Sequence, residues 1–229
     1  MGAMKRAYFI TATGTDLGKT WVTAGVAQAC RERGMTVRAL KPVMSGYDAA
    51  NPEASDAAAL LSEVGAGGMA TAVAQIAPWR FAAPLSPDRA AVLEGRSVAF
   101  SELIGWCRVE IERNPGVLLI EGIGGVMVPL DARQTVRDWI AALGIPVVLV
   151  AGTYLGALSH TLTALAALRE SGIVPATIVV NESAGSTVGV EDAVASLAPH
   201  VTTIPLIILR RDDTAGLDGL ADFLTKDLT

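Results

Sequence analysis

Short, continuous apolar runs recur along the chain, and each is followed by a turn and then by a helical pattern. The runs cover residues 8–10, 37–40, 117–120, 147–150, 178–180 and 201–208. Strands that are apolar without alternation are buried on both faces, as in a parallel sheet covered by helices. The segments between them predict helices over 19–33, 55–64, 87–94, 99–113, 134–143, 157–171, 188–198 and 216–225. The pattern therefore predicts an α/β fold with an open, mostly parallel sheet covered by helices on both faces.

The turns and loops indicate one domain over residues 1–229, because no long linker, internal repeat or charge block divides the chain. Gly34 and Gly172 follow predicted helices, as expected of C-terminal capping glycines. Residues 1–4 are interpreted as an expression remnant or an alternative start. The loosest regions are 46–53 and 65–68. The Pro-rich, aromatic stretch 77–87 is unlike a regular element and is predicted to be a structured loop that forms a lid or a pocket wall.

The predicted helix over 157–171 is apolar around most of its circumference in its middle. A helix of this kind is buried on more sides than one sheet can cover. The second cover is either an oligomer interface or a neighbouring helix, and the sequence supports both equally.

Composition and charge narrow the class of partner. Apolar residues make up 51% of the chain but aromatics only 5%, so we expect a core of Ala, Val, Leu and Ile at helix–sheet contacts. A formal charge of −5 gives no basic field for nucleic acid or for an anionic membrane, which favours small-molecule substrates. No stretch reaches the length of a membrane span and no signal peptide is evident, so a cytoplasmic protein is expected. Cys30 and Cys107 are predicted to be free thiols, and His160 and His200 structural.

The sequence Thr11-Ala-Thr-Gly-Thr-Asp-Leu-Gly-Lys-Thr20 lies between an apolar strand and a helix, which is the layout of a phosphate-binding loop. In that interpretation Lys19 reaches the phosphates and the Thr20 hydroxyl reaches Mg²⁺. Three residues, not the usual four, separate Gly14 from Gly18, and Ala12 stands where an earlier glycine would be. The alternative is an ordinary strand-to-helix turn, which the agreement of strand, turn and helix makes less favoured.

Further polar residues follow other strands. Glu121 comes directly after the run 117–120 and precedes a Gly-rich loop, Lys41 ends the second strand, and Asp56 opens a helix. Phosphoryl transfer needs lysines, a hydroxyl and carboxylates at the carboxyl ends of parallel strands. The alternatives are a solvated side chain for Glu121 and Lys41, and a helix cap for Asp56.

Taken together, the motifs resemble the dethiobiotin synthetase family from about residue 6 to 207. The residues that carry the resemblance are Gly14-Thr-Asp-Leu-Gly-Lys-Thr20, Lys41-Pro-Val-Met-Ser-Gly46, Ser55-Asp56, Phe81, Ser86-Pro87, Glu121-Gly-Ile-Gly-Gly125, Leu155-Gly156 and Asn181. The resemblance implies a P-loop NTPase-like fold and a homodimer. It also implies a ligase of biotin biosynthesis that uses Mg²⁺ and ATP to form the ureido ring of dethiobiotin from 7,8-diaminopelargonic acid and CO₂. The implied route passes through a carbamate and a carbamic-phosphoric anhydride and releases ADP and phosphate.

The same resemblance implies roles for individual residues. Catalysis would fall to Lys41, Lys19 and Thr15, and Mg²⁺ would be held by Thr20, Asp56 and Glu121. The substrate would be bound by Thr15, Lys41 and Ser45 and, across the dimer interface, by Gly156, Ala157 and Leu158. The nucleotide would be bound by Asp16, Leu17, Gly18, Lys19, Thr20, Trp21, Asp56, Glu121, Gly122, Ile123, Gly124, Asn181, Glu182, Pro205, Leu206 and Ile207.

Three positions depart from the family's common pattern: Ala12 replaces Gly, Asp16 replaces Glu and Asp88 replaces His. None of these departures removes an implied phosphate or metal ligand. Related ATPase switches typically carry a lysine early in the loop, where this chain has residues 11–13 without one, and amidotransferase-linked synthases need a glutaminase domain that this chain lacks. A nucleotide-binding module without catalysis is the remaining alternative, and Lys41 argues against it.

Overall fold

A six-stranded sheet forms the centre of the molecule. The structure, a computed structural model, describes residues 6–61, 68–211 and 214–226. The strands are β1 (Arg6–Ala12), β2 (Val37–Leu40), β5 (Val117–Glu121), β6 (Val147–Ala151), β7 (Thr177–Asn181) and β8 (Leu206–Leu209). Their order is β2-β5-β1-β6-β7-β8, and every neighbouring pair is parallel. The predicted α/β class with a parallel sheet is confirmed.

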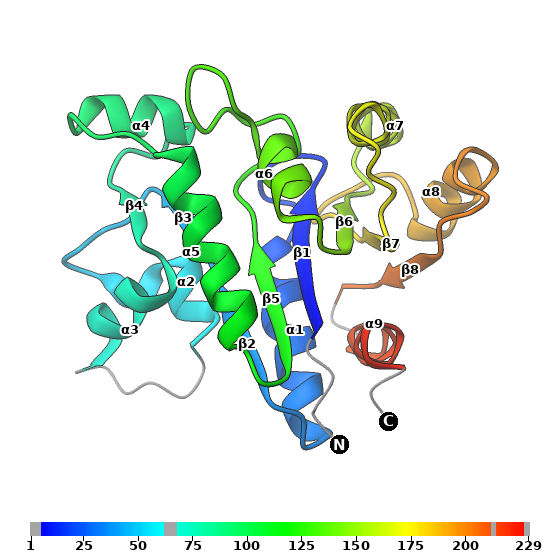
Figure 1. Cartoon of the computed structure of the whole chain (residues 1–229). Helices are drawn as coiled ribbons and strands as arrows, with labels where there is room; N and C mark the ends of the chain where they lie inside the picture. The colour runs from blue at the N-terminus through cyan, green and yellow to red at the C-terminus, as the bar shows by residue number, and fades with distance from the viewer. Residues whose placement is uncertain (1–5, 62–67, 212–213, 227–229) are drawn as a thin grey trace.

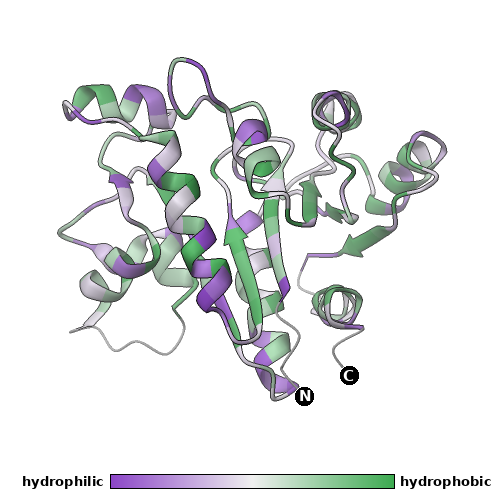
Figure 2. Ribbon diagram, viewed as in Figure 1, coloured by the Kyte–Doolittle hydropathy of each residue, from purple (hydrophilic) through white to green (hydrophobic). Residues whose placement is uncertain are grey.

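Helices cover both faces of this sheet. They are α1 (Lys19–Glu32), α5 (Phe100–Arg113), α6 (Val136–Leu143), α7 (Ala157–Glu170), α8 (Val190–Leu197) and α9 (Ala215–Thr225). In Figure 1, α5 and α6 lie in front of the sheet and α1 lies behind it, and α9 packs against α1 and β8. Figure 2 shows β5 and β8 in the hydrophobic colour, and every residue of β5 and β6 is buried, as continuous apolar strands require.

A smaller unit extends from the β2 side of the sheet. It contains the parallel pair β3 (Val43–Ser45) and β4 (Trp79–Phe81), the helices α2 (Asp56–Ala59), α3 (Met69–Ile76) and α4 (Pro87–Leu93), and the 3₁₀ turn η1 (Pro52–Ala54). A second 3₁₀ turn, η3 (Ala198–His200), follows α8. The smaller unit carries one wall of the main cavity described below.

Three sequence predictions differ from the structure, and two short elements were not predicted. The strand expected over 201–208 begins only at Leu206, because residues 201–205 form turns that end at Pro205, which has no N–H to donate to a ladder. The helix expected over 55–64 ends at Ala59, and residues 62–64 lie outside the described chain. The stretch 77–87, expected to be a loop, contains the strand β4, whereas α4 begins at Pro87 as predicted; β3 and α3 were not predicted. Residues 1–4 and 65–67 are also outside the described parts.

Several smaller predictions can be checked directly. Cys30 and Cys107 are buried free thiols, as expected. Gly34 and Gly172 adopt left-handed conformations after α1 and α7, as capping glycines do. Helix α7 buries one face within this chain, and His160 on its exposed side is 2.6 Å from the Tyr154 hydroxyl through Nδ1. Among the described residues, no helix combines the length and apolar character needed to cross a membrane.

Candidate active site

The loop between β1 and α1 turns through two left-handed residues, Asp16 (φ 58°) and Gly18 (φ 84°). A Cβ atom at Gly18 would lie 2.4 Å from the Asn181 side-chain nitrogen, so both conformation and space require glycine there. Ala12 lies at the end of β1 and not among the left-handed residues, so its methyl group is accommodated without strain. The departure from the family's glycine at this position therefore leaves the loop geometry intact.

Lys19 is the first residue of α1 and is buried. Its ammonium group donates to the Gly14 carbonyl oxygen at 3.1 Å, so the side chain folds back over the loop. The first N–H groups of an α-helix have no acceptor within the helix and attract anions. The lysine and these amides together form an anion-binding cradle.

A buried charge cluster lies beside this cradle. Lys41, 2% exposed, donates to Glu121 Oε1 at 2.5 Å and to the Gly122 carbonyl oxygen at 3.1 Å, and lies 3.2 Å from Asp56 Oδ2. The Thr20 hydroxyl donates to the same Glu121 oxygen at 2.7 Å. Because Glu121 ends β5 and Lys41 follows β2, their contact results from the pairing of these two strands. The solvated alternative for Lys41 and Glu121 is wrong.

The surroundings shift the pKa values of the two lysines in opposite directions. Burial and the nearby charge of Lys41 lower the pKa of Lys19 from 10.5 to about 8. Burial also disfavours the charge on Lys41, but the ion pairs with Glu121 and Asp56 outweigh it and hold the pKa of Lys41 above its ordinary value. Lys41 is therefore a permanently charged group at neutral pH.

Lys19, Lys41 and Asp56 line one cavity of about 990 Å³, whereas the fully buried Glu121 lies behind its wall. Of the implied site residues, the cavity wall contains Thr15, Asp16, Gly18, Lys19, Thr20, Lys41, Ser45, Asp56, Ile123 and Gly124. The cavity wall also contains residues for which the sequence implied no individual binding or catalytic role: Met44, Gly46, Ala54, Ser55, Pro84, Leu85, Ser86, Pro87 and Val128. Four of these belong to the stretch 77–87, so the expectation of a pocket wall there is confirmed.

Asn181 ends β7 and reaches the phosphate-binding loop, where its side-chain nitrogen donates to the Leu17 carbonyl oxygen at 2.9 Å. Glu182 follows it and accepts from the Arg211 N–H at 2.8 Å. Leu206 and Ile207, by contrast, are the first two residues of β8. The residue opposite Asn181 is Leu209, so Pro205, Leu206 and Ile207 lie toward the other end of the strand. The structure does not bring these three residues to the carboxyl edge where the loop lies.

Gly156, Ala157 and Leu158 line a separate hollow of about 210 Å³ between α7 and α8. Gly156 is left-handed and α7 begins directly after it. Leu155, at the rim of this hollow, is 86% exposed. Trp21, in the first turn of α1, is also partly exposed and does not line the main cavity.

A phosphate-binding loop with a buried lysine, next to a carboxylate and a second lysine at the carboxyl edge of a parallel sheet, defines a P-loop nucleotide-binding protein. Solved structures agree on the fold. A ParA family ATPase from Chlorobium tepidum superposes with a TM-score of 0.52 at 13% identity, covering 98% of this chain and 92% of that one. A MinC:MinD complex chain from Aquifex aeolicus gives 0.54 at 13% identity, covering 97% and 88%.

Sequence relatives identify the family. A family model described as an AAA domain matches residues 6–208. Proteins described as ATP-dependent dethiobiotin synthetase BioD are 51% identical in Acidiphilium cryptum, covering 86% of this chain and 89% of the relative, and 43% identical in Caulobacter sp. strain K31, covering 95% and 94%. The relative from Methylobacterium nodulans is 44% identical and covers 88% and 92%. The chain belongs to the dethiobiotin synthetase family.

Proposed function

We propose that the protein closes the ureido ring of dethiobiotin from 7,8-diaminopelargonic acid and CO₂ at the expense of ATP. The observation that carries this proposal is the second lysine, Lys41, held 2.5 Å from Glu121 in the same cavity as Lys19. A module that only binds nucleotide needs one lysine at the phosphates and has no use for a second. A phosphoryl-transfer enzyme needs both, because negative charge develops on the acceptor as well as on the nucleotide.

The order of events follows from the chemistry of the substrates. One amine of the diamine adds to CO₂ to give a carbamate, and the γ-phosphoryl group of ATP passes to a carbamate oxygen. The second amine then attacks the carbonyl carbon of the mixed anhydride, and inorganic phosphate leaves as the ring closes. Lys19 and Lys41 would flank the carbamate and the γ-phosphate, and Thr15 and Ser45 would hydrogen-bond the substrate end of the cavity.

The oxygen groups of the site suit Mg²⁺. Glu121 is fully buried, yet its Oε2 atom has no hydrogen-bond partner in the described part of the chain. A buried, unpaired carboxylate oxygen is costly unless a cation or donor satisfies it. Thr20, Asp56 and Glu121 would hold the ion with hard oxygen ligands, and the ion would neutralise charge on the nucleotide phosphates. Since Lys41 bonds both carboxylates, it would compete with the ion for them.

The remaining roles concern the nucleotide base and a partner subunit. We assign Asn181 to binding of the nucleotide base. Its side chain contacts the loop that would hold the phosphates, which supports this assignment. We also propose that the protein acts in the cytoplasm as a homodimer, in which Gly156, Ala157 and Leu158 of one subunit present the N-terminus of α7 to the substrate carboxylate of the other. A helix N-terminus favours a carboxylate.

The test is ADP release by the purified protein with Mg-ATP and bicarbonate, with and without the diamine, while dethiobiotin is followed by mass spectrometry. We expect one dethiobiotin per ADP, and only when the diamine is present. ADP formed at the same rate without the diamine, or the absence of a ureido product, would refute the proposed reaction.

A further inference from the structure

The wall of the main cavity between β4 and α4 consists of residues 82–86, and Pro84, Leu85 and Ser86 face the cavity. One side of this wall is attached to β3. The Gly46 N–H donates to the Ala83 carbonyl oxygen at 3.2 Å, and Ser45 lies opposite Phe81 in the β3–β4 pair. The position of the wall therefore sets the width of the cavity beside Ser45.

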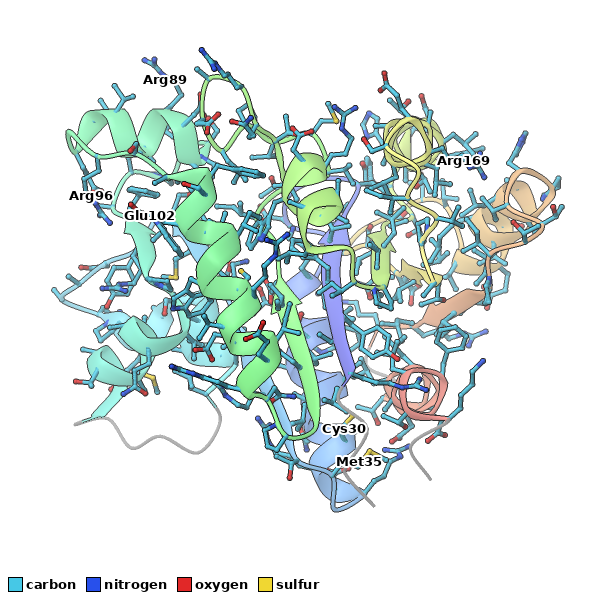
Figure 3. The ribbon with its side chains drawn as sticks, in the orientation of Figure 1. Cys30, Met35, Arg89, Arg96, Glu102 and Arg169 are labelled. Carbon is cyan, nitrogen blue, oxygen red and sulfur yellow. The ribbon has the colours of Figure 1, made fainter. Side chains whose placement is uncertain are left out.

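The other side of the wall is held from outside the cavity. Glu94, just after α4, accepts a hydrogen bond from the Ala82 N–H at 2.7 Å through Oε1. Its second oxygen accepts from Arg96 at 2.9 Å. Figure 3 shows Arg96 at the edge of the molecule, below α4. Because neither Glu94 nor Arg96 lines the cavity, both contacts act on the wall from behind.

Arg96 makes two further contacts with β4. The same guanidinium nitrogen donates to the Arg80 carbonyl oxygen at 2.8 Å, and the guanidinium carbon lies 4.8 Å from the centre of the Phe81 ring. A cation over an aromatic face is attracted by the ring. The turn that delivers Arg96 is itself defined: Gly95 is left-handed and the Arg96 N–H bonds to the Ala91 carbonyl oxygen at 2.9 Å. Glu94 and Arg96 together thus connect the C-terminal end of α4 to β4 and to the first residue of the wall.

We propose that Glu94 and Arg96, which we name the wall clamp, are positioning residues that hold the 82–86 wall at the width the diamine substrate requires. This inference rests on the proposed function, because it assigns the Ser45 side of the cavity to the diamine. The phosphate-binding loop is attached to β1 and α1 and makes no contact with the clamp in the described structure. Loss of the clamp should therefore weaken binding of the diamine and leave that of ATP unchanged.

The variants are Glu94→Ala, which removes both contacts, and Glu94→Gln, which keeps an acceptor for the Ala82 N–H. We expect Glu94→Ala to raise KM for the diamine about tenfold, with KM for ATP and kcat within about twofold. Glu94→Gln should recover most of this loss. Hydrogen exchange of the peptide that spans residues 82–86 should be faster in Glu94→Ala, since the Ala82 N–H loses its acceptor.

The matched control is Glu110→Ala. Glu110 also pairs with an arginine, Arg38, at 2.7 Å, and Arg38 is as exposed as Arg96, but this pair lies between α5 and β2. The control should leave both KM values unchanged. The proposal is overturned if the diamine KM does not rise in Glu94→Ala, or if both KM values rise together with a lowered Tm. If the wild-type protein forms no dethiobiotin, the proposed function fails and the substrate role of the clamp fails with it. The exchange rates still report whether Glu94 fastens the wall.

Discussion

The ion pair of Lys41 and Glu121 removes two charges from water. Its contribution to the free energy of unfolding depends on both partners being present. Glu121 is fully buried and Lys41 almost so. Removing one partner of a buried pair leaves an uncompensated charge and typically costs about 3–5 kcal/mol of unfolding free energy. Any substitution at Lys41 must therefore be measured for stability as well as for activity.

For Lys41→Ala, we expect turnover to fall by about 100-fold or more while nucleotide affinity stays within about threefold. The reason is that the charge of Lys41 matters chiefly when the phosphoryl group moves, whereas Lys19 and the loop amides hold the nucleotide. The measurements are kcat and the Kd for ADP at temperatures well below unfolding, together with a separate determination of Tm. Equal losses in ADP affinity and turnover would contradict the assigned role.

The lowered pKa of Lys19 predicts that nucleotide binding depends on pH. Its pKa is about 8 when folded and 10.5 ordinarily, so between these values the unfolded chain holds a proton that the folded protein lacks. Folding stability should therefore rise with pH across this window, and the buried charge should cost about 3 kcal/mol below it. Because phosphates favour the charged lysine, ADP affinity should fall as pH rises above 8.

Calorimetry in two buffers of different ionisation heat tests this directly. At pH 8, ADP binding should take up about half a proton, since Lys19 is then half charged. The control is Lys19→Arg, which does not titrate in this range and should show no uptake. An ADP affinity that stays constant from pH 7 to 9 would show that Lys19 is already charged in the free protein.

Among the elements, the short helix α2 carries Asp56 into the site, and its cap is Ser55. The Ser55 hydroxyl accepts from the Ala58 N–H at 3.2 Å and donates to the Pro52 carbonyl oxygen at 2.7 Å. The sequence suggested Asp56 as the N-terminal cap of this helix, but Ser55 makes the capping hydrogen bond. With only four residues, α2 depends on this cap more than a long helix would.

We expect Ser55→Ala to lower stability by about 1 kcal/mol and to raise the Mg²⁺ concentration needed for half-maximal activity several-fold. The control is Thr135→Ala, which breaks the capping box of α6 at a residue that does not line the main cavity. It should lose a similar amount of stability with an unchanged Mg²⁺ requirement. Thermal unfolding and Mg²⁺ titrations of both variants make the comparison. If the two variants respond to Mg²⁺ alike, then Ser55 does not position Asp56.

The elements differ in how well the sequence predicts them. Long helices such as α1 and α5 and the buried strands match to within a residue or two, because their apolar pattern extends over many positions. The strands β3 and β4 have three residues each and pair across a separation of 36 positions, which is too short and too distant for periodicity to reveal. Helix α3 had a usable signal, since Met69, Val73 and Ile76 recur at helical spacing.

The residues of the site also differ in how well the sequence predicts them. Lys19, Thr20 and Glu121 could be predicted because each stands at a strand end or in a motif. The Pro-rich stretch 77–87 was predicted to form a lid or a pocket wall, but the sequence did not indicate that Pro84 and Leu85 would be the residues facing the cavity, because β3 and β4 pair over a long separation. The strand register likewise decides which residues of β8 reach the carboxyl edge, and it brings Leu209 there in place of residues 205–207.

At the scale of the whole molecule, two hollows lie near the carboxyl edge of one sheet. The larger holds the lysines, and the smaller lies beside the first residues of α7. Within a single chain, the smaller hollow is bordered by the highly exposed Leu155 and the partly exposed Leu158. Burying an aliphatic side chain of this size contributes about 2 kcal/mol. An apolar rim next to a helix N-terminus fits the homodimer proposed above, in which this end of α7 completes the partner's site.

Leu155→Glu places a charge in that proposed interface, so it should shift the protein from dimer to monomer in sedimentation velocity at micromolar concentration. ADP affinity should stay unchanged because the phosphate-binding loop lies within one chain, whereas KM for the diamine should rise about tenfold or more as the partner's helix N-terminus is lost. The control is Val174→Glu, an exposed apolar residue that follows the far end of α7 and should remain dimeric. A wild-type protein that is monomeric and fully active would contradict the shared site, and the α7 N-terminus would then have no part in binding the substrate.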